Sequence, residues 1–193
     1  MPAEIATRLL PVVEALLREK GYSGLNIREV AERTGMGPAT IYKYFGSKEG
    51  LALRVIKDQD SAIAAHVAER IPADGPAKQK WLAFYRALLG YYDDHPTAAA
   101  VQNIAMPTST WFLPEDQWPV TGLARVLRGL IQEGRADGEL DPAVADNQIA
   151  ATHYMHLVRE VRLWWTRGRR WRLTDRIDRF FPVIWKTIST PGK

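Results

Sequence analysis

The stretch GMGPATIYKYFGSKEGL, residues 35–51, carries several hydrogen-bonding side chains close together. Thr40 offers a hydroxyl, Tyr42 a phenol, and Lys43 and Lys48 offer ammonium groups. Such groups donate hydrogen bonds to phosphate oxygens and to the acceptors on base edges. A short helix that carries them without bulky neighbours suits the major groove of B-DNA, which is about 12 Å wide. The pattern therefore points to nucleic-acid binding.

A helix must precede these side chains if they are to be held in place. Asn26 is a predicted N-cap, and Glu29 follows three residues later in a capping-box pattern. Val30 and Ala31 are predicted to face the core of this short helix, residues 27–34, and Gly35 ends it. The turn Gly35–Gly37 that follows is the sharp connection that a helix-turn-helix needs.

The second helix is predicted from Pro38, in its first turn, to about Tyr44. Ile41 and Phe45 lie four residues apart, so they share a buried face. Thr40, Lys43 and Ala39 then lie on the opposite, exposed side, and Tyr42 and Tyr44 flank it. The alternative is a packed corner in which Tyr44 belongs mostly to the core.

Ser47 is predicted to cap the long helix that follows, which begins at Lys48 and continues to about Arg70. Because backbone N–H groups at a helix start favour an anion, Lys48 is a predicted phosphate contact.

Charge is unevenly distributed along the 193 residues. The net charge is +4, and residues 1–57 hold nine Lys and Arg residues against six acidic residues. Most of the positive excess therefore lies in the part of the chain that carries the motif. The bias is milder than that of a protein that coats nucleic acid.

The remaining sequence is helical in pattern, with no alternation typical of strands and no repeat. A linker at residues 71–76 is followed by predicted helices at 77–92, 97–105, 115–133, 142–166 and 174–188, with a loop at 106–114. The predicted fold is all-α with about nine helices. Residues 1–47 form a three-helix DNA-binding unit that continues into the helix 48–70, and residues 71–193 form a larger helical bundle.

Several classes of protein are excluded or disfavoured. The chain has no cysteine, so it has no disulfide, zinc finger or thiol nucleophile, which fits a cytoplasmic location. The start of the sequence lacks the features of a signal peptide, and no run is long enough to span a membrane. No nucleophile elbow, P-loop or dinucleotide-binding loop is present, and the adjacent Asp93 and Asp94 point about 100° apart on a helix. We therefore expect no enzyme and no cofactor.

Aromatic and sulfur-bearing side chains crowd the middle of the chain. Most of them are expected in the core, and a few are expected to line a pocket for an apolar or aromatic ligand. His153, His156 and Glu160 share one helical face and resemble a metal-ligand set, but pocket lining is the preferred interpretation and no metal is predicted. The candidate ligand-binding residues are Trp81, Tyr85, Tyr92, Met106, Trp118, His153 and His156.

The stretch from Arg159 to Phe181 holds eight arginines with three interleaved tryptophans. This composition allows base stacking or contact with a membrane surface. A subunit interface is preferred, because Trp and Arg are favoured there. The candidate interface residues are Trp164, Trp165, Phe180, Phe181 and Trp185.

Residues 25–56, LNIREVAERTGMGPATIYKYFGSKEGLALRVI, closely resemble the DNA-binding signature of the tetracycline-repressor (TetR) family of bacterial regulators. The resemblance extends over about the first 57 residues, and beyond them only length and helicity match. The matching residues are Ile27, Val30, Ala31, Gly35, Thr40, Tyr42, Tyr44, Phe45, Lys48 and Leu51.

This resemblance implies a homodimer that binds double-stranded DNA and is released by a small molecule held in the larger unit. It implies DNA contacts at Gly37, Pro38, Ala39, Thr40, Tyr42, Lys43, Tyr44 and Lys48. Tyr42 and Lys48 resemble phosphate clamps, whereas Lys43 and residues 37–39 would lie nearest the bases. Because residues 37–39 carry few reaching side chains, more of the readout is left to Lys43 and to DNA shape.

The function predicted from the sequence is a ligand-responsive transcriptional regulator, with repression preferred. The competing hypothesis is a helical protein that binds a small molecule or a metal without binding DNA.

Overall fold

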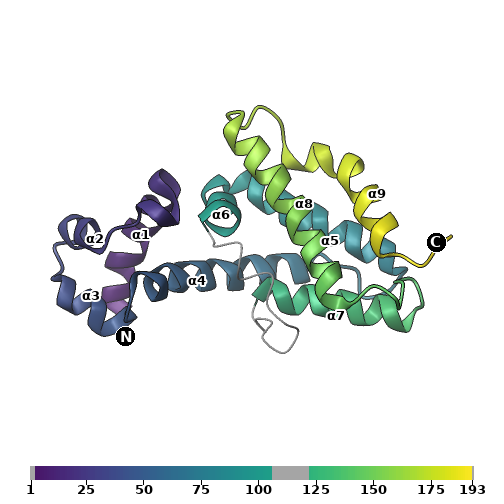
Figure 1. Cartoon of the computed structure of the whole chain (residues 1–193), viewed down its shortest axis with the longest axis horizontal. Helices are drawn as coiled ribbons and strands as arrows, with labels where there is room; N and C mark the ends of the chain where they lie inside the picture. Colours follow the sequence, from purple (N-terminus) through teal and green to yellow (C-terminus); the bar gives the residue numbers. More distant parts are fainter. Residues whose placement is uncertain (1–2, 106–121, 193) are drawn as a thin grey trace.

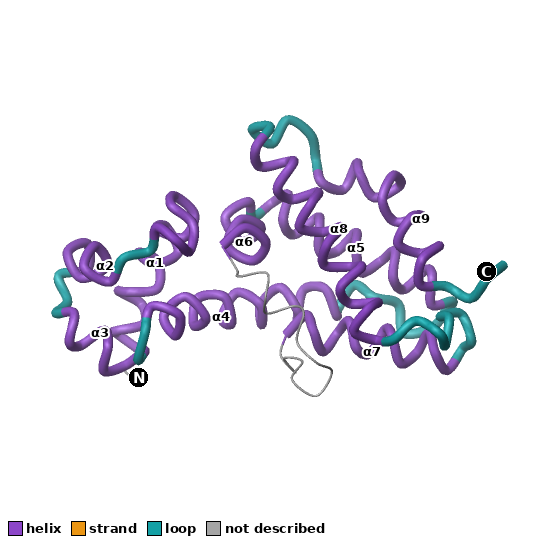
Figure 2. The backbone as a smooth tube through the Cα atoms, viewed as in Figure 1, coloured by secondary structure: helices purple, strands orange, loops and turns teal. Residues whose placement is uncertain are grey.

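The computed structural model describes residues 3–105 and 122–192, and their regular secondary structure is helical (Figures 1 and 2). This confirms the predicted all-α class. Within those ranges the one β-type pairing is an isolated bridge between Leu140 and Ser189. The α-helices are α1 (Ala3–Gly24), α2 (Ile27–Thr34), α3 (Pro38–Phe45), α4 (Lys48–Ala68), α5 (Ala77–Asp94), α6 (Pro96–Ala100), α7 (Gly122–Ala136), α8 (Asp146–Thr166) and α9 (Ile177–Ile188).

Helix bounds differ from the predicted ones mainly where turns intervene. The predicted helix 97–105 is α6 followed by a π-helical turn, Val101–Ala105. The predicted helix 174–188 begins instead with a 3₁₀ turn, Leu173–Arg176. The predicted helix 142–166 begins only at Asp146, as α8. It starts later because Asp141 closes a turn by accepting from the backbone N–H groups of Ala143 and Val144. The predicted loop 106–114 and the start of the predicted helix 115–133 lie outside the described residues.

Two hydrophobic cores organise the molecule. The smaller core joins the buried faces of α1, α2, α3 and the first half of α4. Its buried side chains are aliphatic, and Tyr22 and Phe45 pack at its edge. Figure 1 shows these helices as a separate group at the left. The buried residues of the smaller core are Leu9, Val13, Leu16, Leu17, Leu25, Ile27, Val30, Ala31, Ile41, Leu51, Ala52, Val55 and Val101.

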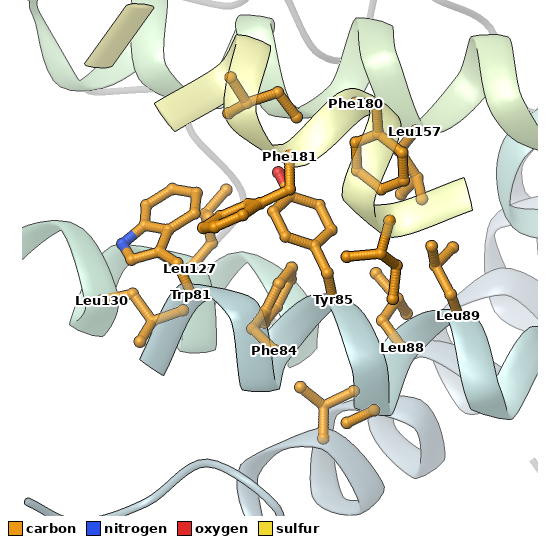
Figure 3. Close-up of a cluster of buried hydrophobic side chains, with 14 of the residues drawn as sticks. Trp81, Phe84, Tyr85, Leu88, Leu89, Leu127, Leu130, Leu157, Phe180 and Phe181 are labelled. Carbon is orange, nitrogen blue, oxygen red and sulfur yellow. The ribbon is translucent and has the colours of Figure 1, made fainter. Parts of the chain in front are cut away.

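The larger core fills the bundle of α5, α7, α8 and α9 and is rich in aromatic rings. Figure 3 shows Phe180 and Phe181 of α9 reaching towards Tyr85 of α5. The ring centroids of Phe180 and Tyr85 lie 5.2 Å apart, with the rings nearly perpendicular. Edge-to-face contacts of this kind add to the stability that burial alone provides.

Helix α4 belongs to both cores and joins the two groups of helices (Figure 1). Leu51 and Val55 pack in the smaller core, whereas Ile63 and Val67 pack in the larger one. Val101 of the π-helical turn is fully buried in the smaller core, although it follows the bundle helices α5 and α6 in sequence. The two units therefore touch through α4 and through this turn.

The structure corrects the predicted subunit interface. Trp164, Phe180, Phe181 and Trp185 are buried in the core of their own chain, so they have almost no surface to offer a second chain. The sequence pattern placed large residues on α8 and α9 but did not show which side of each helix faces inward. Trp165 is half-buried and remains partly accessible. Among the described helices, none is both long and apolar enough to span a membrane.

Candidate nucleic-acid interface

Helix α2 is anchored at both ends. Asn26 caps its start, since the Asn26 Oδ1 atom accepts from the backbone N–H of Arg28 at 2.9 Å. The predicted capping box is wrong for Glu29, whose carboxylate instead accepts from Lys20 Nζ and from Arg33 Nη2, each at 2.8 Å. The Lys20 ammonium, followed by the Arg33 guanidinium, lowers the pKa of Glu29. Glu29 thereby ties α2 to α1.

The turn after α2 requires a glycine. Gly35 has a φ of 64°, in the left-handed region, and its N–H bonds to the last carbonyls of α2. A Cβ atom at this position would also lie 3.0 Å from the Arg8 Nη2 atom. The predicted end of the first helix at Gly35 is therefore confirmed, and the turn directs the chain into α3.

Helix α3 is held against the smaller core by Ile41, which is fully buried, and by Phe45, which packs on the edge of that core. Pro38 stands in the first turn, and the cap residue Gly37 has no side-chain acceptor for the N–H groups of that turn. The N–H groups of Thr40 and Ile41 bond instead to the Gly37 carbonyl oxygen, at 3.0 and 3.3 Å.

The eight predicted DNA-contact residues lie on one continuous corner of the molecule. Tyr42 is 51% exposed, and Lys43 is exposed with its ammonium 5.9 Å from the centre of the Tyr44 ring. Tyr44 and Thr40 are half-buried, so both fill part of the corner while remaining accessible. The other four are exposed or half-buried: Gly37, Pro38, Ala39 and Lys48.

A recess of about 510 Å³ lies beside α3. Its lining includes Tyr42 and Lys48 together with the start of α2, from Asn26 to Arg28. The Lys48 Nζ atom lies 3.4 Å from the Ser23 carbonyl oxygen and 4.6 Å from the centre of the Tyr22 ring. Lys48 therefore reaches back over the end of α1.

This placement changes which helix supports the predicted phosphate site. The sequence suggested the start of α4, where Ser47 Oγ accepts from the Gly50 N–H at 3.1 Å, as Asn26 Oδ1 accepts from the Arg28 N–H at the start of α2. The structure instead brings Lys48 beside the start of α2, whose N-terminus is the positive end of the helix dipole. An anion in the recess would meet a lysine, a tyrosine hydroxyl and this helix terminus.

Arg28 was missed by the sequence interpretation. It is exposed, it lies in the first turn of α2, and it lines the same recess. A cationic residue near a helix start destabilises the helix, because it lies at the positive end of the helix dipole. The position of Arg28 therefore indicates that an external anion is expected there. That signal becomes clear only once α2 and Lys48 are seen together.

Three of the predicted ligand-binding residues are packed in the larger core. Trp81, Tyr85 and Tyr92 have essentially no exposed surface, so as the chain is folded here they offer none to a ligand. Tyr85 Oη and His153 Nδ1 are hydrogen-bonded at 2.8 Å, and burial, with a smaller effect of His156, lowers the pKa of His153 to about 3. Met106 and Trp118 lie outside the described residues.

The face that carries His153, His156 and Glu160 is divided among separate partners. His156 Nδ1 contacts the Thr152 carbonyl oxygen at 2.8 Å, and Glu160 pairs with Arg159 and Arg176. Within the described part of the chain, no three side chains of metal-ligating type are grouped to hold an ion.

The part of the chain that carries this interface matches a known protein family. The family described as "Bacterial regulatory proteins, tetR family" matches residues 10–55, which include α2, α3 and the start of α4. The "Fatty acid metabolism regulator protein" of Bacillus subtilis is 23% identical over 136 residues, or 69% of each chain. The "HTH-type transcriptional repressor NemR" of Escherichia coli K12 is 23% identical over 109 residues, which span 56% of this chain and 55% of that protein.

Solved structures match the fold of nearly the whole chain. A putative tetR family transcription regulator from Shewanella sp. PV-4 superposes with a TM-score of 0.75 at 19% identity, covering 95% of this chain and 97% of that one. The regulator FadR from Bacillus subtilis, solved in complex with stearoyl-CoA, superposes with a TM-score of 0.70 at 18% identity, covering 92% and 96%. The likeness extends beyond the matched motif to the bundle.

Proposed function

We propose that this chain, a DNA-binding transcriptional regulator of the tetR family, represses transcription as a dimer on a palindromic operator and is released by a small molecule. The observation that carries the proposal is the corner of α3, where exposed Lys43 and Tyr42 lie next to the recess of Lys48 and Arg28. Each of these groups faces outward, and together they match a phosphate backbone beside a major groove.

The contacts divide into two kinds. Tyr42, Lys48 and Arg28 are proposed to bind phosphates, with the start of α2 contributing backbone N–H groups. Lys43 and the surface of residues 37–39 are proposed to lie nearest the bases. Because Gly37, Pro38 and Ala39 offer no side-chain hydrogen bond, sequence preference would depend on Lys43 and on the shape of the DNA.

A dimer is proposed because a palindrome presents two half-sites about 34–36 Å apart, and one chain carries one α3. Because Trp164, Phe180, Phe181 and Trp185 are buried, other residues of α8 and α9 are proposed to form the interface. Met155 of α8 is 51% exposed and Val183 of α9 is 53% exposed, which is unusual for such side chains. Both are proposed to lie in the interface with the half-buried Trp165.

Release by a ligand is supported by the contacts between the two units. Helix α4 contributes to both cores, and Val101 of the bundle side packs in the smaller core. Arg18 Nη1 of α1 also lies 3.5 Å from Thr97 Oγ1 of α6. A ligand that favours a different arrangement of the bundle would therefore change the spacing of the two α3 helices in a dimer.

The effector is proposed to be an apolar or aromatic small molecule. The aromatic composition of the bundle supports this class, as do the fatty-acid regulator and the stearoyl-CoA complex among the similar proteins.

Selection of bound fragments from random double-stranded DNA tests the proposal. We expect a palindromic consensus with half-sites one duplex turn apart, and a solution mass of two chains. Met155→Glu should shift the protein towards one chain, whereas Gln132→Glu, an exposed control on α7, should not. Failure to enrich any sequence, or a monomeric mass on DNA, would contradict the proposal.

A further inference from the structure

A second recess lies on the bundle, between the junction of α5 and α6 and the loop that joins α8 to the 3₁₀ turn. Its volume is about 580 Å³, within the range of small-molecule sites. The lining includes Asp93, Pro96, Arg169, Arg170, Trp171 and Arg172. This loop is at the top of the bundle in Figure 1, whereas α3 lies at the lower left.

The carboxylates in the lining are already engaged. Asp93 accepts from the backbone N–H groups of Leu173 at 2.6 Å and Thr174 at 3.2 Å, and from the Thr174 hydroxyl at 2.9 Å. Asp175 accepts from the backbone N–H of Arg172 at 3.2 Å. These bonds fix the loop against α5 and consume lone pairs of both carboxylates.

The arginines, in contrast, keep donors available. The Arg172 Nε atom lies 3.5 Å from Asp93 Oδ2, and its Nη2 atom lies 3.3 Å from Asp94 Oδ1. The Arg172 side chain is nevertheless 60% exposed. Arg170 is exposed, and no described residue pairs with its guanidinium. Arg169 stacks on Trp165, with 5.5 Å between the guanidinium carbon and the ring centre. A guanidinium has five donors, so each of the three can bind an additional anion.

The loop is held in shape around these side chains. The Trp164 indole N–H donates to the Trp171 carbonyl oxygen at 2.7 Å, and the Arg176 guanidinium lies 5.5 Å from the centre of the Trp171 ring. Arg169 has a φ of 57°, which is uncommon for a residue other than glycine. The arginines are therefore presented by a fixed loop.

Stabilisation of the negative end of the α8 dipole explains only some of the arginines in this loop. Cations in the last turn of a helix stabilise its negative end, and Arg167 directly after Thr166 fits that role. Arg170 and Arg172 lie beyond the reach of the effect, which falls off within the last turn. Their clustering around a recess needs another explanation.

We propose that this recess binds a small molecule that carries a phosphate or diphosphate group, with Arg170 and Arg172 as the principal ligands. Planar guanidinium groups bind phosphate oxygens in pairs, which suits two arginines at the rim of one recess. A nucleic-acid role is disfavoured because the loop lies away from α3 (Figure 1). The site does not depend on the proposed repressor function, since it uses no residue of the DNA interface.

Pro96, which lines the recess, begins α6, and the next residue, Thr97, contacts Arg18 of α1. An occupant would therefore lie next to the contact between the bundle and the DNA-binding unit. The contact between Thr97 and Arg18 would connect an occupant to α1.

Calorimetric titration of the full chain with inorganic pyrophosphate, and separately with ADP, tests the site. We expect both to bind, and the Arg170→Gln/Arg172→Gln double variant to weaken each by about tenfold or more, since a hydrogen bond to a charged group contributes roughly tenfold in affinity. Arg86→Gln removes an exposed arginine of α5 outside the recess and should leave both affinities unchanged. Tighter binding of ADP would indicate that the nucleoside part is also held.

The single variant Arg170→Gln should leave the structure of the loop intact, because Arg170 is exposed and no described residue pairs with its guanidinium. It should weaken pyrophosphate binding while the melting temperature stays that of the wild type. The proposal is overturned if neither probe binds at millimolar concentration, or if binding is the same in the double variant. It is also overturned if the arginine variants lose affinity for random DNA but not for pyrophosphate.

Discussion

The two cores of this molecule are built from different side chains. The buried side chains of the smaller core, around α1 to α3, are aliphatic, whereas the larger core contains tryptophan, tyrosine and phenylalanine packed ring against ring (Figure 3). Tyr42 and Lys43 of the smaller unit are exposed, whereas Trp81 and Tyr85 of the bundle are fully buried.

This difference decides where function can be recognised. A small aliphatic core needs no polar or aromatic residue, so Tyr42 and Lys43 on its surface stand out as candidates for binding. In the bundle, an aromatic residue can pack the core or line a pocket, and the two roles have the same pattern in sequence. Trp81 and Tyr85 proved to be packed.

The largest expected effect tests whether the two cores unfold together. Ile41→Ala and Leu88→Ala each remove a fully buried side chain and should cost about 2–5 kcal/mol. Because α4 spans both cores, we expect one transition in urea. All seven tryptophans lie beyond residue 80, and the five that the structure describes lie in or against the larger core, so their fluorescence reports on the bundle.

Ile41→Ala should therefore lower the urea midpoint seen by tryptophan fluorescence, although no tryptophan that the structure describes packs in the smaller core. If only the circular dichroism changes and the fluorescence midpoint stays fixed, the two cores are independent units.

The second effect concerns the buried polar pair of the larger core. Burial lowers the pKa of His153 to about 3, so the unfolded chain takes up a proton below its ordinary pKa of about 6.5 and the folded chain does not. The contribution of neutral His153 to the free energy of unfolding is fully present above pH 6.5. It decreases as the pH falls towards 3, by roughly 1.4 kcal/mol per pH unit. Urea unfolding at pH 7, 6 and 5 measures this slope.

His153→Gln is the matched control, because its amide can still bond to Tyr85 but does not titrate. The variant should show a flatter slope over the same pH range. An equal slope in both proteins would mean that other groups, not His153, determine the acid sensitivity.

A smaller effect examines the contact between the units. Val101→Ala removes two methyl groups from the smaller core, and it should cost about 1–2 kcal/mol. Hydrogen exchange should show reduced amide protection in α1 to α3. Val67→Ala, an equally buried valine of the larger core, should not reduce protection there preferentially. If Val67→Ala reduces protection in α1 to α3 and Val101→Ala does not, Val101 does not couple the two units.

The smallest effects separate the two kinds of DNA contact. Lys48→Ala should weaken binding to all sequences and reduce the slope of log affinity against log salt by about 1. Lys43→Ala should change the preference among sequences. Lys57→Ala, an exposed lysine farther along α4, is the control. A salt slope that Lys48→Ala leaves unchanged would exclude Lys48 as a phosphate contact.

Local features of the fold were predictable because each is determined by neighbouring residues. The caps at Asn26 and Ser47, the end of α2 at Gly35 and the burial of Ile41 all follow from hydrogen bonds or spacings within one or two helical turns. The 3₁₀ turn before α9 was missed because the hydrogen bonds that hold it, such as the one from the Leu173 N–H to Asp93, join residues far apart in sequence.

By itself the sequence determined the helical class, the position of the helix-turn-helix and the side chains that its second helix exposes, because helix periodicity assigns faces directly. Only the tertiary structure decided that Lys48 and Arg28 share a recess with the start of α2, and that Trp164 and Phe181 are core residues. Those facts depend on which helices pack together. Packing is set by the sum of many long-range contacts, and no single spacing in the sequence records it.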